Sequence, residues 1–579
     1  MAPHRHREKK TSLPSTLRAR IGGALATTLV CLHAGAATPS HSPPQEVTRA
    51  LSAAEESSAL PASAGGGWLL IETRTVRLLD ASGQERAKLA LRAEHLDVRA
   101  ARSADQGALA VVFDNNLQQP LLLNVDARTG RLDIRHRFAP VDFALEAMCL
   151  YRDAQQLDHL FLIAKDGLAE QWLLPTSSAA GTPRLLRRLA LPPNAERCRG
   201  DDTLGQLVIE EAGVGVWAYA ADGEGIPQRR LIQAKTSAAG NATLKVTGLP
   251  YVLPQGQTEP MARSGDAADD PAIWVHPGDA ARSRVFGTNK KQGLLSYDLQ
   301  GRQTQLIESG RLNNVDIRQN LRIGMGTAPS VQASALDLAV ATQRDDNALV
   351  VFEIDAQGQA REAARINTSL QDIYGMCLHR TPEGGLHAFA NDKSGRFEQI
   401  RITRDDSGHY QGHLLRSFRT RSQPEGCVAD DATGRLFYGE EKRGIWTLPT
   451  DAQAKTPAEL VLATGATLVA DVEGLAIYRA GSGQAAYLIA SSQGNNSYVV
   501  LDAQAPYRVR GAFRIGINAQ AGIDGASETD GIEVSPVNFG GAHDQGIFVV
   551  QDGYKRLPDG AQNFKYVAWR DIAQALGLN

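Results

Sequence analysis

Acidic residues recur in short motifs through the second half of the chain, and most of them stand beside glycine or proline. Calcium binds about six to eight oxygen ligands, and acids gathered on one face of a protein could supply them. Any one of these acids alone would be a solvated turn residue, so the prediction depends on their repetition. The motifs are Asp266, Asp269-Asp270-Pro271, Glu425-Gly426, Glu440-Glu441, Asp471-Val472-Glu473-Gly474, Asp524-Gly525 and Glu528-Thr529-Asp530-Gly531.

Basic and hydroxyl side chains occur in the same kind of polar loop. An Arg guanidinium can bind phosphate through two parallel hydrogen bonds, and a Lys ammonium acts as a point charge. A single Lys or Arg is usually a surface charge, but cations that alternate with carboxylates fit a site in which a metal bridges protein and phosphate. The residues are Lys290, Lys291, Arg311, Arg344, Tyr374 and Lys393.

Short apolar runs around polar turns predict that β-strands carry these residues. Residues 336–341 and 348–354 form one such pair, 386–391 and 397–402 a second, and 436–439 and 444–448 a third. The 55 glycines indicate many tight turns, and the second half divides into about six blade-sized units, which favours a propeller. Only residues 569–578 have a helical pattern.

An internal duplication relates the two halves of the chain. Residues 79–83 and 95–99 match 297–301 and 314–318, residues 148–150 and 170–171 match 376–378 and 398–399, and residues 198–202 and 215–217 match 427–431 and 444–446. Because order and spacing are preserved, we interpret the first half as a partial copy of the second, about four blades long.

The N-terminus has the pattern of a secretory signal peptide. Residues 1–20 are basic, residues 21–32 are apolar, and Ala34-Gly35-Ala36 is a small-residue cleavage pattern. A membrane anchor is the alternative, but the apolar run is too short to span a bilayer. We therefore expect a secreted protein, either periplasmic or extracellular.

These patterns predict an all-β chain in four parts. They are a signal peptide (1–36), a flexible lead-in (37–66), an incomplete propeller-like domain (67–250) and a six-bladed β-propeller (251–579). The net charge of −3 and the pI near 6.5 give no general electrostatic reason to bind nucleic acid or an anionic membrane. A polyanionic ligand would need local positive charge or bridging metal ions.

Seven motifs of the second half resemble those of the β-propeller phytases, and they cover residues 251–579 in order. They are 269–277 (DDPAIWVHP), 287–291 (GTNKK), 312–318 (LNNVDIR), 471–475 (DVEGL), 491–495 (SSQGN), 528–532 (ETDGI) and 551–553 (QDG). The resemblance implies a six-bladed propeller that uses several calcium ions and a calcium-activated water to remove phosphates from phytate, myo-inositol hexakisphosphate. It also implies a monomer acting on the calcium complex of phytate.

The resemblance assigns roles to individual positions. Active-site calcium would be bound by Asp269, Glu425, Glu441, Asp471, Glu473 and Asp524, with Asp530 at a further metal-binding motif position. A structural calcium would be bound by Asp270 and the Val315 carbonyl. Catalytic contacts to substrate phosphates would come from Lys290, Lys291, Arg344, Tyr374 and Lys393 together with Glu441, and Asn313 and Gln493 match substrate-binding motif positions. Ser394 is a departure, because relatives often carry Glu after the Lys.

Other mechanisms and functions are weighed against this one. The Arg-His-Gly-x-Arg run of the acid phosphatases is absent from the sequence, which argues against a phosphohistidine route. A non-catalytic propeller that binds protein or glycan, and another calcium-dependent propeller hydrolase such as a lactonase, remain alternatives. Calcium-dependent release of phosphate from phytate would discriminate among the three.

The first copy lacks most of the residues that the resemblance assigns. Lys290 aligns with Glu72, Arg344 with Asn115, Tyr374 with Glu146, and Glu441 with Ala212, whereas Lys165 and Glu196 match Lys393 and Glu425. We therefore expect residues 67–250 to be non-catalytic.

The duplication also pairs the four cysteines that follow the signal peptide. Cys149 is equivalent to Cys377 and Cys198 to Cys427, so each copy carries one pair on neighbouring blades. Export would place them in an oxidising compartment. We expect the disulfides Cys149–Cys198 and Cys377–Cys427, with four buried free thiols as the alternative.

Overall fold

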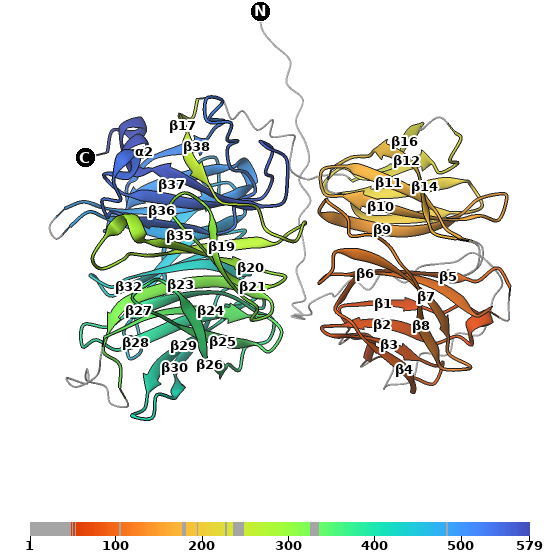
Figure 1. The fold of residues 1–579 in the computed structure, drawn as a ribbon, viewed down its shortest axis with the longest axis horizontal. Helices are drawn as coiled ribbons and strands as arrows, with labels where there is room; N and C mark the ends of the chain where they lie inside the picture. Colours follow the sequence, from red (N-terminus) through yellow and green to blue (C-terminus); the bar gives the residue numbers. More distant parts are fainter. Residues whose placement is uncertain are drawn as a thin grey trace, which may run out of the picture. The chain divides into compact units, whose positions relative to one another are not determined.

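Strands account for almost all the regular structure of the chain (Figure 1). The computed structural model describes residues 48–578 except 49, 53, 104–105, 176–180, 194, 226–227, 236–247, 325–334 and 482–483. The predicted signal peptide and residues 37–47 of the predicted lead-in lie outside the described residues. Residues 45–579 form one contact unit, so the boundary near residue 250 stays a prediction.

Four of the six sheets in residues 251–579 are antiparallel meanders whose strands follow chain order. Their strands are β19 (Ala268–Trp274), β20 (Arg284–Asn289), β21 (Gly293–Tyr297) and β22 (Gln303–Ile307); β23 (Leu312–Leu321), β24 (Leu336–Gln343), β25 (Ala348–Ile354) and β26 (Ala360–Asn367); β27 (Ile373–Arg380), β28 (Leu386–Asp392), β29 (Arg396–Arg404) and β30 (Tyr410–Arg419); and β31 (Pro424–Asp430), β32 (Arg435–Glu440), β33 (Gly444–Pro449) and β34 (Glu459–Ala463).

The other two sheets recruit short strands from the start of this half. The fifth holds β35 (Val472–Arg479), β36 (Ala486–Ser492), β37 (Ser497–Asp502) and β38 (Val509–Ile515), with β17 (Tyr251–Val252) parallel to β38. The sixth holds β39 (Ile532–Ser535), β40 (Ile547–Asp552) and β41 (Asn563–Ala568), with β18 (Pro254–Gln257) antiparallel to β41. The chain start is thus paired with the last blade.

The innermost strands close a ring. Each inner strand contacts the inner strand of the next sheet, in the order β19, β23, β27, β31, β35 and β39, and β39 contacts β19. Each sheet is therefore one blade of a closed six-bladed propeller, an architecture that protects sheet edges from pairing with other chains. The prediction of a six-bladed all-β propeller is confirmed.

The hydrophobic core lies between neighbouring blades rather than in one central layer. Val340 and Val351 of one blade pack in a single cluster with Leu378, Ala388 and Ile400 of the next. Because a blade packs on both faces, its middle strands are buried along their length, as in β36 and β40. This explains why these strands read as apolar runs rather than as strict alternation.

A half-buried arginine joins three inner strands. The Arg318 guanidinium of β23 donates to Asp431 Oδ2 at 2.8 Å and to the Leu378 carbonyl of β27 at 2.6 Å, and it also pairs with Asp316. In the first half the equivalent Arg99 donates to Asp202 at 2.8 Å. The duplication therefore extends to the ion pairs that hold the inner strands together.

Residues 56–234 form four sheets of four antiparallel strands. Their strands are β1 (Glu56–Ala59), β2 (Trp68–Glu72), β3 (Thr75–Leu79) and β4 (Glu85–Ala90); β5 (Ala93–Ala100), β6 (Ala108–Asp114), β7 (Gln119–Asp126) and β8 (Arg131–Arg137); β9 (Leu145–Arg152), β10 (Asp158–Ala164), β11 (Leu168–Leu173) and β12 (Arg184–Ala190); and β13 (Ala195–Asp201), β14 (Gln206–Glu211), β15 (Gly215–Ala220) and β16 (Arg229–Ala234). Inner strands contact in the order β1, β5, β9, β13. The partial propeller-like fold is confirmed.

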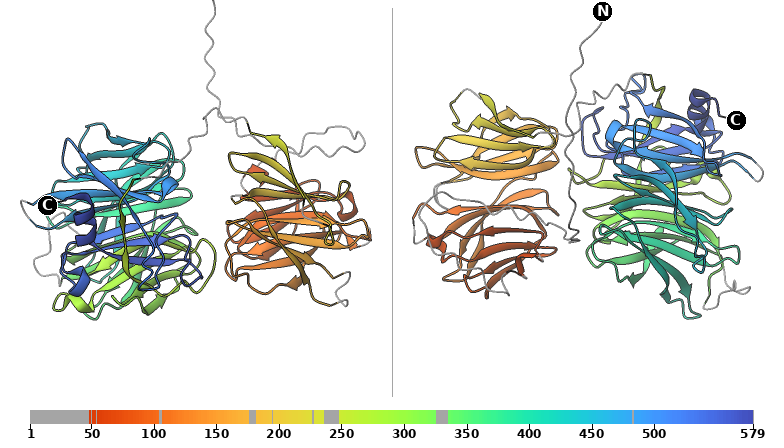
Figure 2. Two further views of the ribbon diagram at one scale, coloured as in Figure 1. Left: turned by 90° about the horizontal axis from the view of Figure 1, so that it is seen from above. Right: turned by 180° about the vertical axis from the view of Figure 1, so that it is seen from behind.

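The C-terminal residues form a helix, as predicted. Helix α2 (Trp569–Leu576) packs against β38 and β17 at the outer edge of the fifth blade (Figure 2). Short 3-10 turns occupy Ala62–Ala64, Ala280–Arg282, Gln493–Asn495 and Gly541–His543. Across the described part of the chain, no helix is both long and apolar enough to span a membrane.

Both predicted disulfides are present. Cys149–Cys198 joins β9 to β13 and Cys377–Cys427 joins β27 to β31, with Cα atoms 5.8 and 5.6 Å apart. Each bridge connects the inner strands of adjacent blades at equivalent positions of the two copies.

Candidate active site

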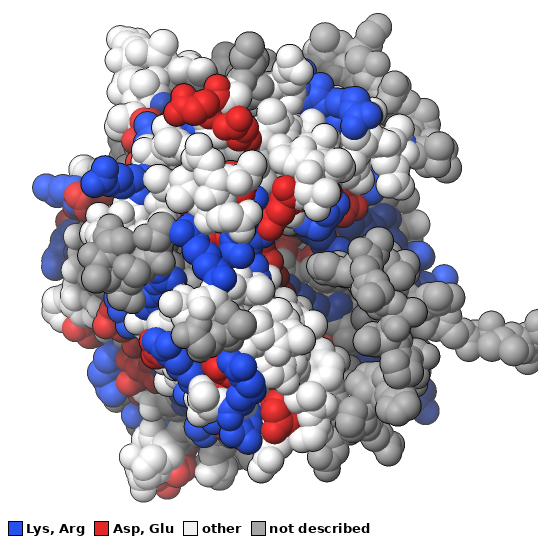
Figure 3. Space-filling model, turned by 90° about the vertical axis from the view of Figure 1, so that its right-hand side faces the viewer, with Lys and Arg blue, Asp and Glu red and all other residues white. Residues whose placement is uncertain are grey.

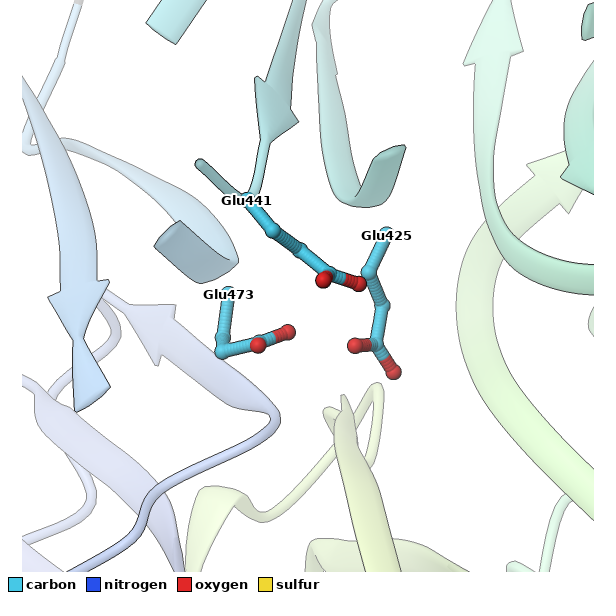
Figure 4. Close-up of side chains that lie close together, drawn as sticks. All are labelled: Glu425, Glu441 and Glu473. Atoms are coloured by element: carbon cyan, nitrogen blue, oxygen red, sulfur yellow. The ribbon is translucent and has the colours of Figure 1, made fainter. Parts of the chain in front are cut away.

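Three glutamates converge at the centre of the six-bladed ring (Figure 4). Glu425 lies near the start of β31, Glu441 directly follows β32, and Glu473 lies near the start of β35. Each is buried and offers a carboxylate oxygen within 4.8 Å of those of the other two. Neighbouring blades thus bring together acids that are far apart in the sequence.

The glutamate cluster has too few hydrogen-bond donors for its charge. Asn313 Nδ2 donates to Glu425 at 3.2 Å and Gln423 Nε2 donates to Glu441 at 2.6 Å, but Glu473 Oε2 is buried with no hydrogen-bond partner among the described residues. Burial, followed by the charge of Glu425, raises the pKa of Glu441 to about 7 and that of Glu473 well above its usual range. Buried like charges of this kind are costly unless a cation accompanies them, and oxygen-only ligands suit calcium.

A second acidic group surrounds Lys290. Its ammonium lies 2.7 Å from both Asp266 and Asp530 and 3.6 Å from Asp269. Burial alone would lower the pKa of Lys290, but these carboxylates outweigh it and the pKa is raised. Gln493 Nε2 donates to the other Asp530 oxygen at 2.8 Å. Lys290, Asp530 and Gln493, predicted from separate motifs, are therefore one hydrogen-bonded set.

Asp269 connects this set to the glutamates. Its side chain is 1% exposed, and neither carboxylate oxygen has a hydrogen-bond partner among the described residues. Burial raises the pKa of Asp269 and the charges of Glu425 and Asp530 raise it further, although Lys290 opposes them. A buried carboxylate with this surrounding fits the role of a cation ligand.

Two of the predicted phosphate-binding cations lie against the ring of Tyr374. The Arg344 guanidinium lies 5.5 Å from the centre of the Tyr374 ring and the Lys393 ammonium 5.0 Å from it. Arg344 also donates to Asn313 at 3.5 Å, and Asn313 bonds Glu425. Burial, with Glu425 and Glu473 nearby, holds the pKa of Tyr374 well above its usual value, so the phenol is a neutral hydrogen-bonding group.

Glycine follows each of four site residues at the start of an inner strand. In Tyr374-Gly375, Glu425-Gly426, Glu473-Gly474 and Asp530-Gly531, a Cβ added to the glycine would lie less than 3.0 Å from a backbone carbonyl oxygen of the next blade, namely that of Glu425, Glu473, Asp530 and Asp269 respectively. Glycine at these positions therefore allows the inner strands to approach closely enough for their carboxylates to converge.

Replacing Gly426 by alanine should push away the strand that carries Glu473. We expect calcium binding, measured by titration calorimetry, to weaken by about tenfold or more, because displaced supporting groups typically cost that much metal affinity. Gly465→Ala is the matched control, since an added Cβ there meets nothing within 4 Å. Equal calcium affinity in the two variants would contradict the role given to Gly426.

The remaining predicted residues lie outside the glutamate cluster. Asp270 accepts hydrogen bonds from the Val315 N–H at 3.1 Å and from Asn314, so it is adjacent to Val315. Asp471 pairs with Lys442 at 2.5 Å, and Lys291 donates to Asn115 at 2.8 Å.

Asp524 is bound by a lysine and a backbone N–H and has no contact with the glutamate cluster among its hydrogen bonds and ion pairs in the described residues. It pairs with the fully buried Lys565 at 2.7 Å and accepts from the Arg556 N–H. Its assignment as an active-site calcium ligand stays a prediction, and the structure gives it a lysine partner instead of the three glutamates.

Two supporting residues were missed by sequence reasoning. Gln423, which donates to Glu441, stands two positions before Glu425, and an amide so close to an acidic motif could have been noticed. Lys565 lies 41 residues from Asp524, in a strand that is buried along its whole length, and no pattern in the sequence indicates that pairing.

Comparison with known proteins places the second half of the chain among the phytases. A family model described as Phytase matches residues 237–579. A 3-phytase of Bacillus subtilis (strain 168) is 40% identical over 333 residues, which are 55% of this chain and 84% of the relative.

Two solved structures also match, at a TM-score of 0.28 each. Saccharomyces cerevisiae Sqt1 is 11% identical, with 74% of this chain and 98% of that chain covered. A nidogen/laminin complex is 15% identical, with 46% and 82% covered. At these TM-scores neither likeness adds to the fold described above.

Proposed function

The chain belongs to the phytase family and is a phosphoric monoester hydrolase, and we propose that it is a calcium-dependent phytase acting on myo-inositol hexakisphosphate. The observation that carries the finer proposal is the cluster of Glu425, Glu441 and Glu473, set beside the cations around Tyr374. Buried acids and cations side by side suit a site in which metal ions and lysine or arginine share the charge of one substrate.

Several oxygen ligands are available for calcium. We assign the active-site ions to Glu425, Glu441 and Glu473 together with Asp269, Asp471, Asp524 and Asp530, and a structural ion to Asp270 with the Val315 carbonyl. The unpartnered oxygens of Glu473 and Asp269 support the assignment for those two. When bound, calcium would activate the attacking water and offset the charge of the phosphate.

The chain's own cations position the substrate. The net charge is −3, so attraction of a polyanion must be local. On the face that Figure 3 draws, Lys and Arg side chains are interspersed with Asp and Glu. We assign phosphate contacts to Lys290, Lys291, Arg344, Tyr374 and Lys393, supported by Asn313 and Gln493. Arg can bind a phosphate through two parallel bonds, whereas the Tyr374 hydroxyl donates one.

The reaction is an in-line displacement. The oxygen of water forms a bond to phosphorus and gives up one proton, the bond between phosphorus and the inositol oxygen breaks, and the inositol oxygen takes up one proton, so that one water is consumed in total. The products are inorganic phosphate and an inositol phosphate with one phosphate fewer. Lys290 and Arg344 hold the phosphate oxygens during the displacement, and the inner-strand ring keeps Glu425 and Glu473 fixed.

We further propose that the chain is secreted and acts as a monomer on the calcium complex of phytate. The two disulfides support an oxidising destination. Residues 67–250 are proposed to be non-catalytic, because Glu72, Asn115, Glu146 and Ala212 replace four site residues of the second half.

Phosphate release from phytate by the full chain tests the proposal. We expect release in calcium, none in excess chelator, and recovery when calcium is restored. Full activity in excess chelator would refute the calcium requirement. Absence of any phosphate release in calcium would refute the phytase activity and would leave the lactonase and binding alternatives.

A further inference from the structure

Three histidines and an arginine stand side by side on the blade formed by β27–β30. His379 of β27 is directly opposite His387 of β28. Arg401 of β29 is opposite His387 on one side and His413 of β30 on the other. Directly opposed residues of antiparallel strands lie on the same face of a sheet, so the four side chains form one row. His379 is five positions from Tyr374, which places the row about 17 Å along β27 from the candidate active site.

A cavity of about 900 Å³ lies beside this row. His379, His387 and Arg401 line it together with three hydroxyl side chains, those of Thr381, Thr403 and Thr450. Because Thr450 directly follows β33, the lining comes from two neighbouring blades. Sites for small molecules typically have volumes of about 300–1,000 Å³, so the cavity is large enough to hold one.

Two polar side chains of the row are incompletely bonded. His379 is 3% exposed, and its Nε2 lies 3.3 Å from the Thr450 hydroxyl, but its Nδ1 is buried with no hydrogen-bond partner among the described residues. The Nε of Arg401 is buried and likewise unpartnered, and the described residues give its guanidinium no ion pair. Buried polar groups without partners are costly, so a ligand that bonds them would be stabilising.

Hydrogen bonds determine which ring nitrogen of His387 carries the proton. The amide of Gln399 is oriented by the Thr450 carbonyl, to which Nε2 donates at 2.8 Å, and by Arg416, from which Oε1 accepts at 2.7 Å. The Gln399 Nε2 therefore faces His387 Nδ1, at 3.0 Å, and Nδ1 is an acceptor. Burial lowers the pKa of His387 to about 4, so the ring is neutral near pH 7. Its proton is then on Nε2, which has no partner among the described residues.

The first half of the chain satisfies the equivalent ring with a carboxylate. His159 corresponds to His387, and its Nε2 lies 3.1 Å from Asp153 Oδ2. The residue equivalent to Asp153 is Thr381, and the arginine of the row has Leu173 as its equivalent. The same sheet position thus has one negative charge fewer and one positive charge more in the second half, which favours an anionic ligand there.

The donors of the cavity fit a phosphate group. A guanidinium can bind phosphate through two parallel hydrogen bonds, and the imidazole N–H and the threonine hydroxyls can donate to further oxygens. The other charged lining residues, Arg322, Glu383 and Asp451, are all exposed, so Arg401 is the half-buried charge of the lining. A positive charge in this place disfavours a metal cation.

We propose that this cavity is an accessory binding site for a phosphate group, held by Arg401 and His387 and separate from the candidate active site. Inorganic phosphate and a small organic phosphate monoester share this chemistry, and the cavity has room for either. The proposal does not depend on the phytase activity, because none of these residues belongs to the site assigned above.

Calorimetry on the full chain in calcium-free buffer tests the proposal, with inorganic phosphate, glucose 6-phosphate and acetate as probes. We expect the wild type to bind phosphate and Arg401→Gln to bind it about tenfold more weakly, since a charge-assisted hydrogen bond contributes about that factor. Arg401→Lys should recover part of the loss, and the exposed control Arg361→Gln should show none. Tighter binding of glucose 6-phosphate would identify a monoester as the ligand, and equal or tighter binding of phosphate would identify inorganic phosphate.

Thr381→Asp is the second variant, because it introduces the carboxylate that the first half has beside its histidine. It should weaken phosphate binding by about tenfold or more, while its melting temperature stays at or above that of the wild type. The binding lost in these two variants should persist in Arg344→Gln, which alters the candidate active site. The proposal is overturned by absence of phosphate binding to the wild type, by equal binding of acetate and phosphate, by unchanged binding in Arg401→Gln and Thr381→Asp, or by loss of all phosphate binding in Arg344→Gln.

Discussion

Replacing Glu473 by glutamine should reduce phosphate release from phytate by about 1,000-fold. Glu473 is buried, one of its oxygens has no hydrogen-bond partner among the described residues, and it faces Glu425 and Glu441. A metal ion bound there would contribute several kcal/mol of transition-state stabilisation, and each 1.36 kcal/mol is about a factor of ten in rate. Glutamine keeps the shape of the side chain and removes its charge.

Stability measurements separate this effect from misfolding. In chelator, Glu473→Gln should unfold at the same temperature as the wild type or higher, because one of three mutually repelling buried carboxylates is gone. In calcium, the wild type should gain stability by ligand linkage and the variant should gain less. The exposed Glu459→Gln is the control and should behave as wild type in both buffers.

Two outcomes would contradict this role for Glu473. One is a rate within a few-fold of the wild type. The other is an equal rise in melting temperature with calcium for variant and wild type.

Much of the fold could be predicted because it repeats. The strand pairs around residues 344–347 and 393–395 have the predicted turns, and the matched cysteines form the matched disulfides. Duplication made the cysteine prediction possible, since equivalent positions in two copies must obey the same geometry. The pairing of β18 with β41 was not predicted, because a short strand far from its partner in sequence leaves no local pattern.

The candidate site could be predicted as a set of motifs but not as an arrangement. The motifs that contain Glu425 and Glu473 could be found in the sequence, whereas their approach to Glu441 depends on how three neighbouring blades meet. Lys290 was expected at a phosphate, and the structure shows it also paired with Asp266 and Asp530. Such cross-blade pairs are set by closure of the ring, which residue spacing does not encode.

Removing the Cys377–Cys427 disulfide by replacing both residues with alanine should lower the free energy of unfolding by about 4 kcal/mol. The bridge closes a loop with a sequence separation of 50, and the loss of loop-closure entropy in the unfolded chain gives about that value. Typical domains have only about 5–15 kcal/mol in total, so the change is large. Denaturant unfolding in calcium-free buffer measures it.

The disulfide should affect stability far more than chemistry, even though Cys427 is two residues from Glu425. Both sulfurs lie in an apolar cluster with Phe389 and Phe397, away from the carboxylates, and β27 and β31 remain joined through Arg318. The double variant should therefore retain most of its rate at low temperature.

Removing Cys149–Cys198, with a separation of 49, is the matched comparison and should destabilise the first half by a similar amount. Four free thiols in the unfolded, unreduced wild type, or unchanged unfolding of the double variant, would contradict the prediction. A rate loss comparable to that of Glu473→Gln would instead mean that the bridge positions Glu425.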